Sequence, residues 1–327
     1  MNDSNKTFLI LGGSGQDGRI LTSKLIYDGF NVIQLNRQFK NYDEILSYKS
    51  LNTKKNKHNL KIIKYDYLNN SVENFIKIIN KYQPQFIVNF ASVSSILEST
   101  KDPYNCVRSG FLNHNIILES LRLLKSDISY VYAGSIEMFH PNNKDCNLSS
   151  NIEPSNPYGL TKALSYLTTK QYREIYSLNV MTAVFSNHES FLRSSRFVTG
   201  KIFRTAIRAI NGESVNLELG SRRVKRDWGL ANEYMDVIFE MLNNEPRDRI
   251  IATGTNITLE KFVDLVFDNL NLDSKKYIKL NDKLSRPDDL FYREINQNEL
   301  SDKIYMNITK SPEEVIEKLT KEWINYG

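Results

Sequence analysis

A tyrosine and a lysine four residues apart are the first candidates for chemistry in this chain of 327 residues. Tyr158 and Lys162 stand in the segment NPYGLTK, at the predicted start of a helix, where a spacing of four places both side chains on one face. A nearby ammonium stabilises a phenolate and lowers the pKa of the phenol, which makes Tyr158 usable as a base near neutral pH. The chain holds 18 tyrosines, so the spacing alone also fits a solvated helical pair.

The segment YAGSIEMF adds a hydroxyl and a carboxylate. Ser135 and Glu137 lie two residues apart, so we expect their side chains to share a face of an extended segment. A hydroxyl beside Tyr158 can hydrogen-bond a substrate oxygen, and the carboxylate can take a proton from carbon or give one to a departing hydroxyl. Because a simple alcohol dehydrogenase does not use that second acid/base group, Glu137 favours an elimination. The alternative is a solvated loop glutamate.

Three glycines in GGSGQDG have the spacing of a nucleotide-binding turn. Gly12, Gly15 and Gly18 lie between a predicted strand and a predicted helix, so a pyrophosphate can approach the backbone at the amino terminus of that helix. An ordinary turn with incidental glycines is the alternative. In the next strand, LNRQ offers Arg37 and no carboxylate, which favours NADP over NAD as the cofactor.

Six β-rich apolar runs must position these residues. They span 7–13, 31–36, 60–66, 86–92, 129–135 and 180–185, mostly separated by amphipathic or polar stretches. This alternation predicts an α/β fold with a Rossmann-like, doubly wound parallel sheet, whose ligand crevice lies beyond the carboxyl ends of the strands. The pattern changes near residue 188. We therefore predict one domain over residues 1–187 and a smaller, interleaved carboxyl-terminal lobe over residues 188–327.

His188, in FSNHESFLRSSRFVTGKI, is one of four histidines. The others, His58, His114 and His140, fall in unrelated segments with no ligand spacing to His188, so the sequence disfavours a metal site. A satisfied structural histidine is one alternative.

Composition limits the remaining possibilities. The hydrophobic content of 40% supports a buried core, while the longest apolar runs fall far short of the roughly 20 residues that a bilayer span needs. We expect a cytoplasmic protein without signal peptide or membrane span, with Cys106 and Cys146 reduced. The net charge is +5. Its densest basic run, Lys49 to Lys61, lacks interleaved aromatics, so we favour a solvated loop and expect no nucleic-acid partner.

Taken together, the motifs resemble the GDP-mannose 4,6-dehydratase family, within the extended short-chain dehydrogenases/reductases. The resemblance runs from GGSGQDG through YGLTK, FSNHES and FVTGKI to KRDWGLANEYM, IATG and SRPDD, and so covers almost the whole chain. NHES and RDWG are specific to this branch. The resemblance implies that residues 1–187 bind NADP and that residues 188–327 bind a nucleotide sugar.

The resemblance also implies roles for individual residues. The catalytic residues would be Ser135, Glu137, Tyr158 and Lys162, without a metal. The cofactor would be bound by Gly12, Gly15, Gln16, Asp17, Gly18, Arg37, Leu68, Ser92, Ser94, Lys162, His188 and Arg193. The substrate would be bound by Asn187, Glu189, Lys201, Arg226 and Arg286.

The implied reaction converts GDP-mannose or GDP-manno-heptose to the 4-keto-6-deoxy sugar. The sugar is oxidised at C4, water is eliminated across C5 and C6, and hydride returns to C6. An epimerase or 4-reductase of the same fold, with Glu137 idle, is the alternative, and a non-catalytic dinucleotide-binding or RNA-associated protein is a third reading. The family pairs through long helices, so we expect a homodimer or homotetramer formed by the segment 105–125 and the helix after Tyr158.

The chain departs from the family pattern at several positions. Tyr67 replaces an aspartate after the third strand, with Asp66 one place early, and Gly200 replaces an arginine. Phe191 and Leu192 also differ from the usual residues. These changes bear on the sugar and on the base of the nucleotide rather than on the chemistry.

Overall fold

The computed structural model describes residues 6–38, 45–46, 58–284 and 292–327. The chain divides into two compact units. The first comprises Met1–His140, Leu148–Phe185 and Met235–Ile250, and the second Pro141–Asn147, Ser186–Tyr234 and Ile251–Gly327. The second unit thus resumes at Ser186, close to the predicted division, but each unit also takes a short segment from the other half of the chain.

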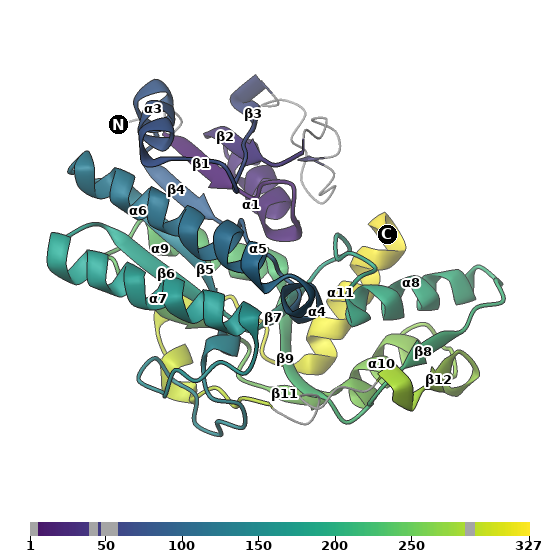
Figure 1. Cartoon of the computed structure of the whole chain (residues 1–327). Coiled ribbons are helices and arrows are strands. Elements are labelled where there is room, and N and C mark those ends of the chain that lie inside the picture. The colour runs from purple at the N-terminus through teal and green to yellow at the C-terminus, as the bar shows by residue number, and fades with distance from the viewer. Residues whose placement is uncertain (1–5, 39–44, 47–57, 285–291) are drawn as a thin grey trace. The chain divides into compact units, whose positions relative to one another are not determined.

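A seven-stranded sheet forms the centre of the first unit (Figure 1). Its strands are β1 (Thr7–Leu11), β2 (Asn31–Asn36), β3 (Leu60–Lys64), β4 (Phe86–Asn89), β5 (Ser129–Ser135), β6 (Val180–Phe185) and β10 (Arg249–Ile251). Their order is β10-β6-β5-β4-β1-β2-β3, and the neighbours from β3 to β6 pair in parallel. This is the order of a doubly wound, dinucleotide-binding sheet, so the predicted fold class is confirmed.

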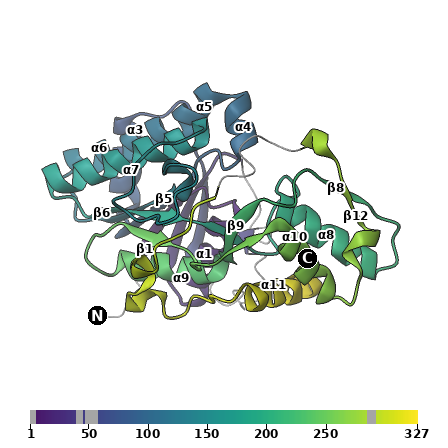
Figure 2. The same ribbon diagram turned by 90° about the horizontal axis from the view of Figure 1, so that it is seen from below.

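Helices cover both faces of this sheet (Figure 2). One face carries α3 (Val72–Tyr82), α6 (Asn113–Leu123) and α7 (Pro157–Tyr176), with the short α4 (Ile96–Lys101), α5 (Pro103–Val107) and a π-helical turn (Arg108–Leu112) nearby. The other face carries α1 (Gln16–Tyr27) and the part of α9 (Ala231–Leu242) that belongs to the first unit. Lys24 of α1 pairs with Asp236 of α9, and Phe239 packs against Phe8 and Phe30.

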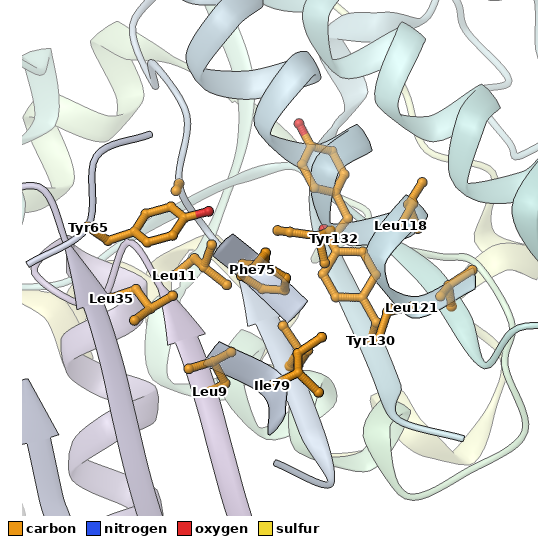
Figure 3. Close-up of a cluster of buried hydrophobic side chains, with 14 of the residues drawn as sticks. Leu9, Leu11, Leu35, Tyr65, Phe75, Ile79, Leu118, Leu121, Tyr130 and Tyr132 are labelled. Atoms are coloured by element: carbon orange, nitrogen blue, oxygen red, sulfur yellow. The ribbon is translucent and has the colours of Figure 1, made fainter. Parts of the chain in front are cut away.

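The central strands are buried throughout. Every residue of β4, β5 and β6 is buried, which explains why these strands appear in the sequence as apolar runs without alternation. Figure 3 shows the cluster between the sheet and the helices α3 and α6, where Leu9 and Tyr130 meet Phe75 and Leu118. The cluster fixes the strands, and therefore the positions of the residues that follow their carboxyl ends.

The second unit has its own small sheets and its own core. One sheet contains β7 (Asn187–Glu189), β9 (Lys225–Leu230) and β11 (Asn256–Thr258), and the other pairs β8 (Leu217–Leu219) with β12 (Ile278–Leu280). Its helices are α8 (Val198–Ile210), α10 (Leu259–Asp268) and α11 (Pro312–Tyr326). Phe203 of α8 stacks on Trp323 of α11 with ring centroids 5.5 Å apart and also contacts Phe262 of α10.

Among the described residues, no helix has both the length and the apolar character that a bilayer span requires.

Candidate active site

The turn between β1 and α1 is built so that only glycine fits at two positions. Gly12 has a positive φ of +76°, and a Cβ there would lie 2.9 Å from the backbone nitrogen of Ala91. A Cβ at Gly18 would lie 2.5 Å from the Cα of Gly13. The first turn of α1, beginning at Gln16, therefore packs closely against the loop. Such a cradle, at a helix amino terminus, fits a pyrophosphate.

We expect Gly18→Ala to lower the free energy of unfolding by about 1–3 kcal/mol, the usual cost of overpacking, because the clash is with backbone that cannot rotate away. Gly15→Ser is the matched control, since a Cβ at residue 15 meets nothing closer than the Gly12 carbonyl oxygen at 3.4 Å and serine is a good N-cap residue. Urea denaturation of both variants checks this. Equal stability of the two variants would contradict the packing argument.

Tyr158 and Lys162 lie at the start of α7, as predicted. The Asn156 side chain accepts the Gly159 N–H at 2.8 Å and Pro157 is the first helical residue, so the sequence itself fixes where the helix begins. The Lys162 Nζ lies 5.6 Å from the centre of the Tyr158 ring. The ammonium thus lies within cation–π distance of the tyrosine ring.

Lys162 is 3% exposed and firmly held. Its Nζ donates to the Ser92 Oγ at 2.9 Å and to the Ala133 carbonyl oxygen at 2.6 Å, and lies 4.8 Å from the centre of the Tyr132 ring. Burial lowers the pKa of Lys162 to about 8, although charges on Cys106 and Asp17 act in the opposite direction. The lysine therefore titrates near physiological pH.

This pKa predicts a pH-dependent difference in stability between the wild type and Lys162→Met. Lysine has an ordinary pKa of 10.5, so between pH 8 and 10.5 the unfolded wild type holds more protons than the folded protein. The free energy of unfolding of the wild type should therefore rise relative to the variant as the pH increases through this window. Thermal unfolding of both proteins across the window tests this. A constant difference would contradict a buried, depressed Lys162.

Ser135 and Glu137 lie together, but not as an alternating extended pair. Ser135 is the last residue of β5 and 6% exposed, whereas Glu137 belongs to a 3₁₀ turn (Ile136–Met138). The Ser135 Oγ accepts the Glu137 N–H at 3.2 Å. The predicted shared face is therefore wrong, because the serine hydroxyl caps the turn that ends the strand.

Gly159 places the start of α7 against this turn. A Cβ at Gly159 would lie 2.4 Å from the carbonyl oxygen of Glu137, so a larger residue would push the two segments apart. The close approach brings the segment holding Tyr158 to the segment holding Ser135 and Glu137. Sequence reasoning missed Gly159, although a glycine inside YxxxK was a visible signal.

The other predicted cofactor residues of the first unit lie in the loops that follow the strands or at the start of α1. Arg37 and Ser94 are exposed, and the Leu68 N–H donates to Asp66 at 2.9 Å. The Gln16 Nε2 donates to the Asp17 Oδ1 at 3.1 Å. Of these residues, Asp17 interacts electrostatically with Lys162, which links the glycine turn to α7.

In the second unit, His188 is held in place by its own unit. It is 8% exposed, its Nδ1 lies 2.9 Å from the Ser186 carbonyl oxygen, and its ring lies 5.1 Å from that of Tyr234. Because a carbonyl oxygen only accepts, Nδ1 carries the proton. Within the described ranges, no group of three or more His, Cys, Asp and Glu side chains could hold a metal ion.

Asp227 fixes the strand next to His188, and sequence reasoning missed it. This carboxylate is 1% exposed and accepts hydrogen bonds from the N–H groups of Thr253 and Gly254 and from the Ser186 Oγ. Burial raises its pKa to about 6 despite these bonds. The aspartate of RDWG thus connects β9 to Ser186, directly before β7, and to the loop between β10 and β11. Its place directly after Lys225 and Arg226 gave no local signal of burial.

Glu189 and Arg193, predicted to bind substrate and cofactor respectively, are paired with each other. The Arg193 Nε donates to the Glu189 carboxylate and its Nη2 donates to the His188 carbonyl oxygen. Asn187 and Arg226 are half-buried. Lys201 is exposed on α8, and Arg286 lies outside the described residues.

The glycine at position 200 has a physical reason. A Cβ there would lie 2.6 Å from the Ser194 carbonyl oxygen and 2.9 Å from the Nη1 of Arg204. The Arg204 guanidinium fills this space, donating to the carbonyl oxygens of Gly200 and Arg193 at 3.0 and 2.8 Å. An arginine at position 200 would have no room.

Comparisons of the sequence and of the fold with known proteins identify the family. The sequence model of the family described as GDP-mannose 4,6 dehydratase matches residues 9–315. GDP-mannose 4,6 dehydratase 2 of Arabidopsis thaliana is 31% identical over 305 residues, covering 87% of this chain and 78% of the relative. GDP-mannose 4,6 dehydratase of Dictyostelium discoideum is 26% identical over 358 residues, covering 100% and 98%.

Solved structures show the same fold. UDP-N-acetylglucosamine 4-epimerase from Methanobrevibacter ruminantium M1 superposes with a TM-score of 0.81 at 21% identity, covering 98% of this chain and 99% of the other. The dTDP-glucose 4,6-dehydratase of Bacillus anthracis str. Ames, in complex with NAD, has a TM-score of 0.79 at 17% identity, covering 98% and 96%. With the family match over residues 9–315, the chain belongs to the GDP-mannose 4,6-dehydratase family.

Proposed function

We propose that this protein is a nucleotide-sugar 4,6-dehydratase that acts on a GDP-linked, manno-configured sugar, either GDP-mannose or GDP-manno-heptose. The observation that carries the proposal is the meeting of two segments in the first unit. Gly159 lets the helix of Tyr158 and Lys162 pack directly on the turn that holds Ser135 and Glu137. A second acid/base group beside a tyrosine–lysine pair suits elimination rather than oxidation alone.

Each residue of this group has a separate task. Tyr158, which lies beside the ammonium of Lys162, takes the proton from the sugar 4-hydroxyl. The Ser135 hydroxyl donates to the oxygen at C4 and orients the ketone, which makes the C5 proton acidic. Glu137 takes the C5 proton and protonates the departing 6-hydroxyl, which leaves as water. When hydride reaches C6, C5 regains one proton, which balances the proton that Tyr158 took from the 4-hydroxyl. The product is the 4-keto-6-deoxy sugar, still attached to its nucleotide.

The cofactor is a nicotinamide dinucleotide, with NADP favoured over NAD. A bound nicotinamide would supply the hydride acceptor for C4 and the hydride donor for C6, so the reaction would need no external reductant. The cradle formed by Gly12 and Gly18 fits a pyrophosphate, and Arg37 supplies a cation for the 2′-phosphate. We assign further cofactor contacts to Gly15, Gln16, Asp17, Leu68, Ser92, Ser94, Lys162, His188 and Arg193.

The second unit supplies cations for the GDP diphosphate. Arg226 and Arg286 carry planar guanidinium groups that suit phosphate oxygens, and Lys201 adds a third charge. We assign Asn187 and Glu189 to contacts with the sugar of the substrate. Since Glu189 is held by Arg193, we expect it to position that arginine as well as any ligand.

A second copy of the chain is the proposed partner, in a homodimer or homotetramer, and we place the protein in the cytoplasm. Apolar side chains stand exposed on the segments expected to pair: Leu112 (47%), Leu123 (52%), Leu160 (45%), Leu167 (44%) and Ile175 (66%). Residues 49–57 of the basic run lie outside the described residues, and we assign that run no partner.

Mass spectrometry of reactions with a panel of nucleotide sugars tests the substrate. The panel contains GDP-mannose, GDP-manno-heptose, UDP-glucose and dTDP-glucose, with no added reductant. Loss of one water from a GDP-linked sugar alone is the expected result. Loss of water only from a UDP- or dTDP-sugar would overturn the GDP assignment, and a product of unchanged mass but altered configuration would favour an epimerase.

A further inference from the structure

The strand β2 ends in two buried amide side chains that support the glycine turn. Gln34 and Asn36 are both 0% exposed and, two residues apart, point to the same face. The Gln34 Nε2 donates to the Thr22 Oγ1 of α1 at 2.6 Å and to the Gly13 carbonyl oxygen at 3.2 Å. The Asn36 Nδ2 donates to the Gln34 Oε1 at 2.9 Å. The amides thus connect β2, α1 and the turn.

Asn36 completes this network by accepting the Ser14 N–H on its Oδ1 at 3.1 Å. Each donor in the network has a fixed direction, because the amide hydrogens of Gln34 are already used on Thr22 and Gly13. An aspartate at position 36 would place a second oxygen against the Gln34 Oε1 with no proton between them. It would also bury a charge, which is costly without a partner. The network therefore requires a neutral amide at position 36.

Tyr67 supports the same turn from the other side. Its Oη accepts the Gly12 N–H at 2.9 Å and donates to the Leu35 carbonyl oxygen. Burial raises the pKa of the Tyr67 phenol well above its ordinary range, so the phenol stays neutral. The neighbouring Asp66 is engaged elsewhere, because its carboxylate accepts the Leu68 N–H at 2.9 Å. Position 67 thus holds a neutral hydrogen-bonding group beside the turn.

We propose that Asn36 is a specificity-determining residue for the coenzyme: with Gln34 and Tyr67 it holds the glycine turn and keeps the end of β2 neutral, so that Arg37 selects a 2′-phosphate. The end of β2 is where an acidic residue holds the ribose hydroxyls in NAD-dependent enzymes, and an acid there repels the extra phosphate of NADP. Arg37 follows Asn36 directly and is exposed, and its charge acts on the Tyr67 phenol. The inference rests on the nicotinamide coenzyme of the proposed function.

Calorimetric binding of two adenosine fragments to the full-length protein tests the proposal without any sugar or turnover. The fragments are 2′,5′-ADP, which carries the 2′-phosphate, and 5′-AMP, which lacks it. We expect the wild type to bind 2′,5′-ADP at least about tenfold more tightly, and Asn36→Asp to reduce that ratio by about tenfold. Asn31→Asp, at the other end of the same strand, adds the same charge and should leave the ratio unchanged. An unchanged ratio in folded Asn36→Asp, or no preference in the wild type, would overturn the proposal.

Tyr67→Phe provides a second test if Asn36→Asp does not fold. It keeps the ring and removes only the hydroxyl. Because the turn loosens, we expect both fragments to bind at least about threefold more weakly, with the ratio of their two affinities preserved. Unchanged affinity for both fragments would show that the hydroxyl does not support the turn and would refute the proposed role of Tyr67. A protein that prefers 2′,5′-ADP but dehydrates no GDP-sugar would refute the proposed function alone. A dehydratase without that preference would refute this inference alone.

Discussion

Glu137→Gln should lower kcat for loss of water by roughly 10³-fold, within the range that general acid/base catalysis contributes, while KM changes little. The amide keeps the size of the side chain but can neither take the C5 proton nor protonate the departing hydroxyl. Because Tyr158 and Lys162 remain, oxidation at C4 should still occur, and a 4-keto sugar that keeps its 6-hydroxyl should accumulate on the enzyme. Mass spectrometry of acid-quenched single-turnover reactions measures both species.

Glu153→Gln is the matched control for Glu137, because it removes a carboxylate whose side chain is 66% exposed, on the segment that follows the 3₁₀ turn. It should leave turnover unchanged. If Glu137→Gln dehydrates its substrate at the wild-type rate, elimination does not use Glu137. The enzyme would then fit an epimerase or 4-reductase of the same fold.

Tyr158→Phe should also reduce turnover by roughly 10³-fold, but at an earlier step. Removing the phenol leaves no base for the 4-hydroxyl, so we expect neither the 4-keto sugar nor the dehydrated product. Binding of 2′,5′-ADP should stay within about twofold of the wild type, since a loss of base strength affects the reaction and not the adenosine end. Rapid-quench kinetics and calorimetry measure the two effects separately.

Tyr176→Phe, at the carboxyl end of the same helix, is the control for Tyr158. Its ring is 45% exposed and packs under Arg122, so losing its hydroxyl should change neither rate nor binding. Formation of the 4-keto sugar by Tyr158→Phe at the wild-type rate would assign the proton abstraction to another group.

The sequence predicted the parts of the molecule that depend on local pattern. The alternation of apolar runs with helical stretches indicated the parallel sheet, and Asn156 and Pro157 mark the start of α7 so clearly that the placement of Tyr158 and Lys162 followed. These features depend on neighbours within a few residues.

Features that depend on tertiary contacts were missed or wrong. Glu137 was expected in an extended segment, but the Ser135 hydroxyl caps a 3₁₀ turn instead. The role of Asn36 depends on Ser14, which lies 22 residues away in the chain. The strand β7 has only three residues and is defined by its pairing with β9, so no periodicity could reveal it. Long-range hydrogen bonds of this kind leave no local signal in a single sequence.

GDP-mannose deuterated at C4 gives the most direct test of the internal redox cycle. The substrate is incubated with enzyme and coenzyme but no added reductant, and the product is analysed by mass spectrometry and NMR. We expect a 4-keto-6-deoxy product that has lost one water and carries the deuterium at C6 of the same sugar. A product with deuterium lost to solvent, or an oxidised sugar that retains its 6-hydroxyl, would contradict it.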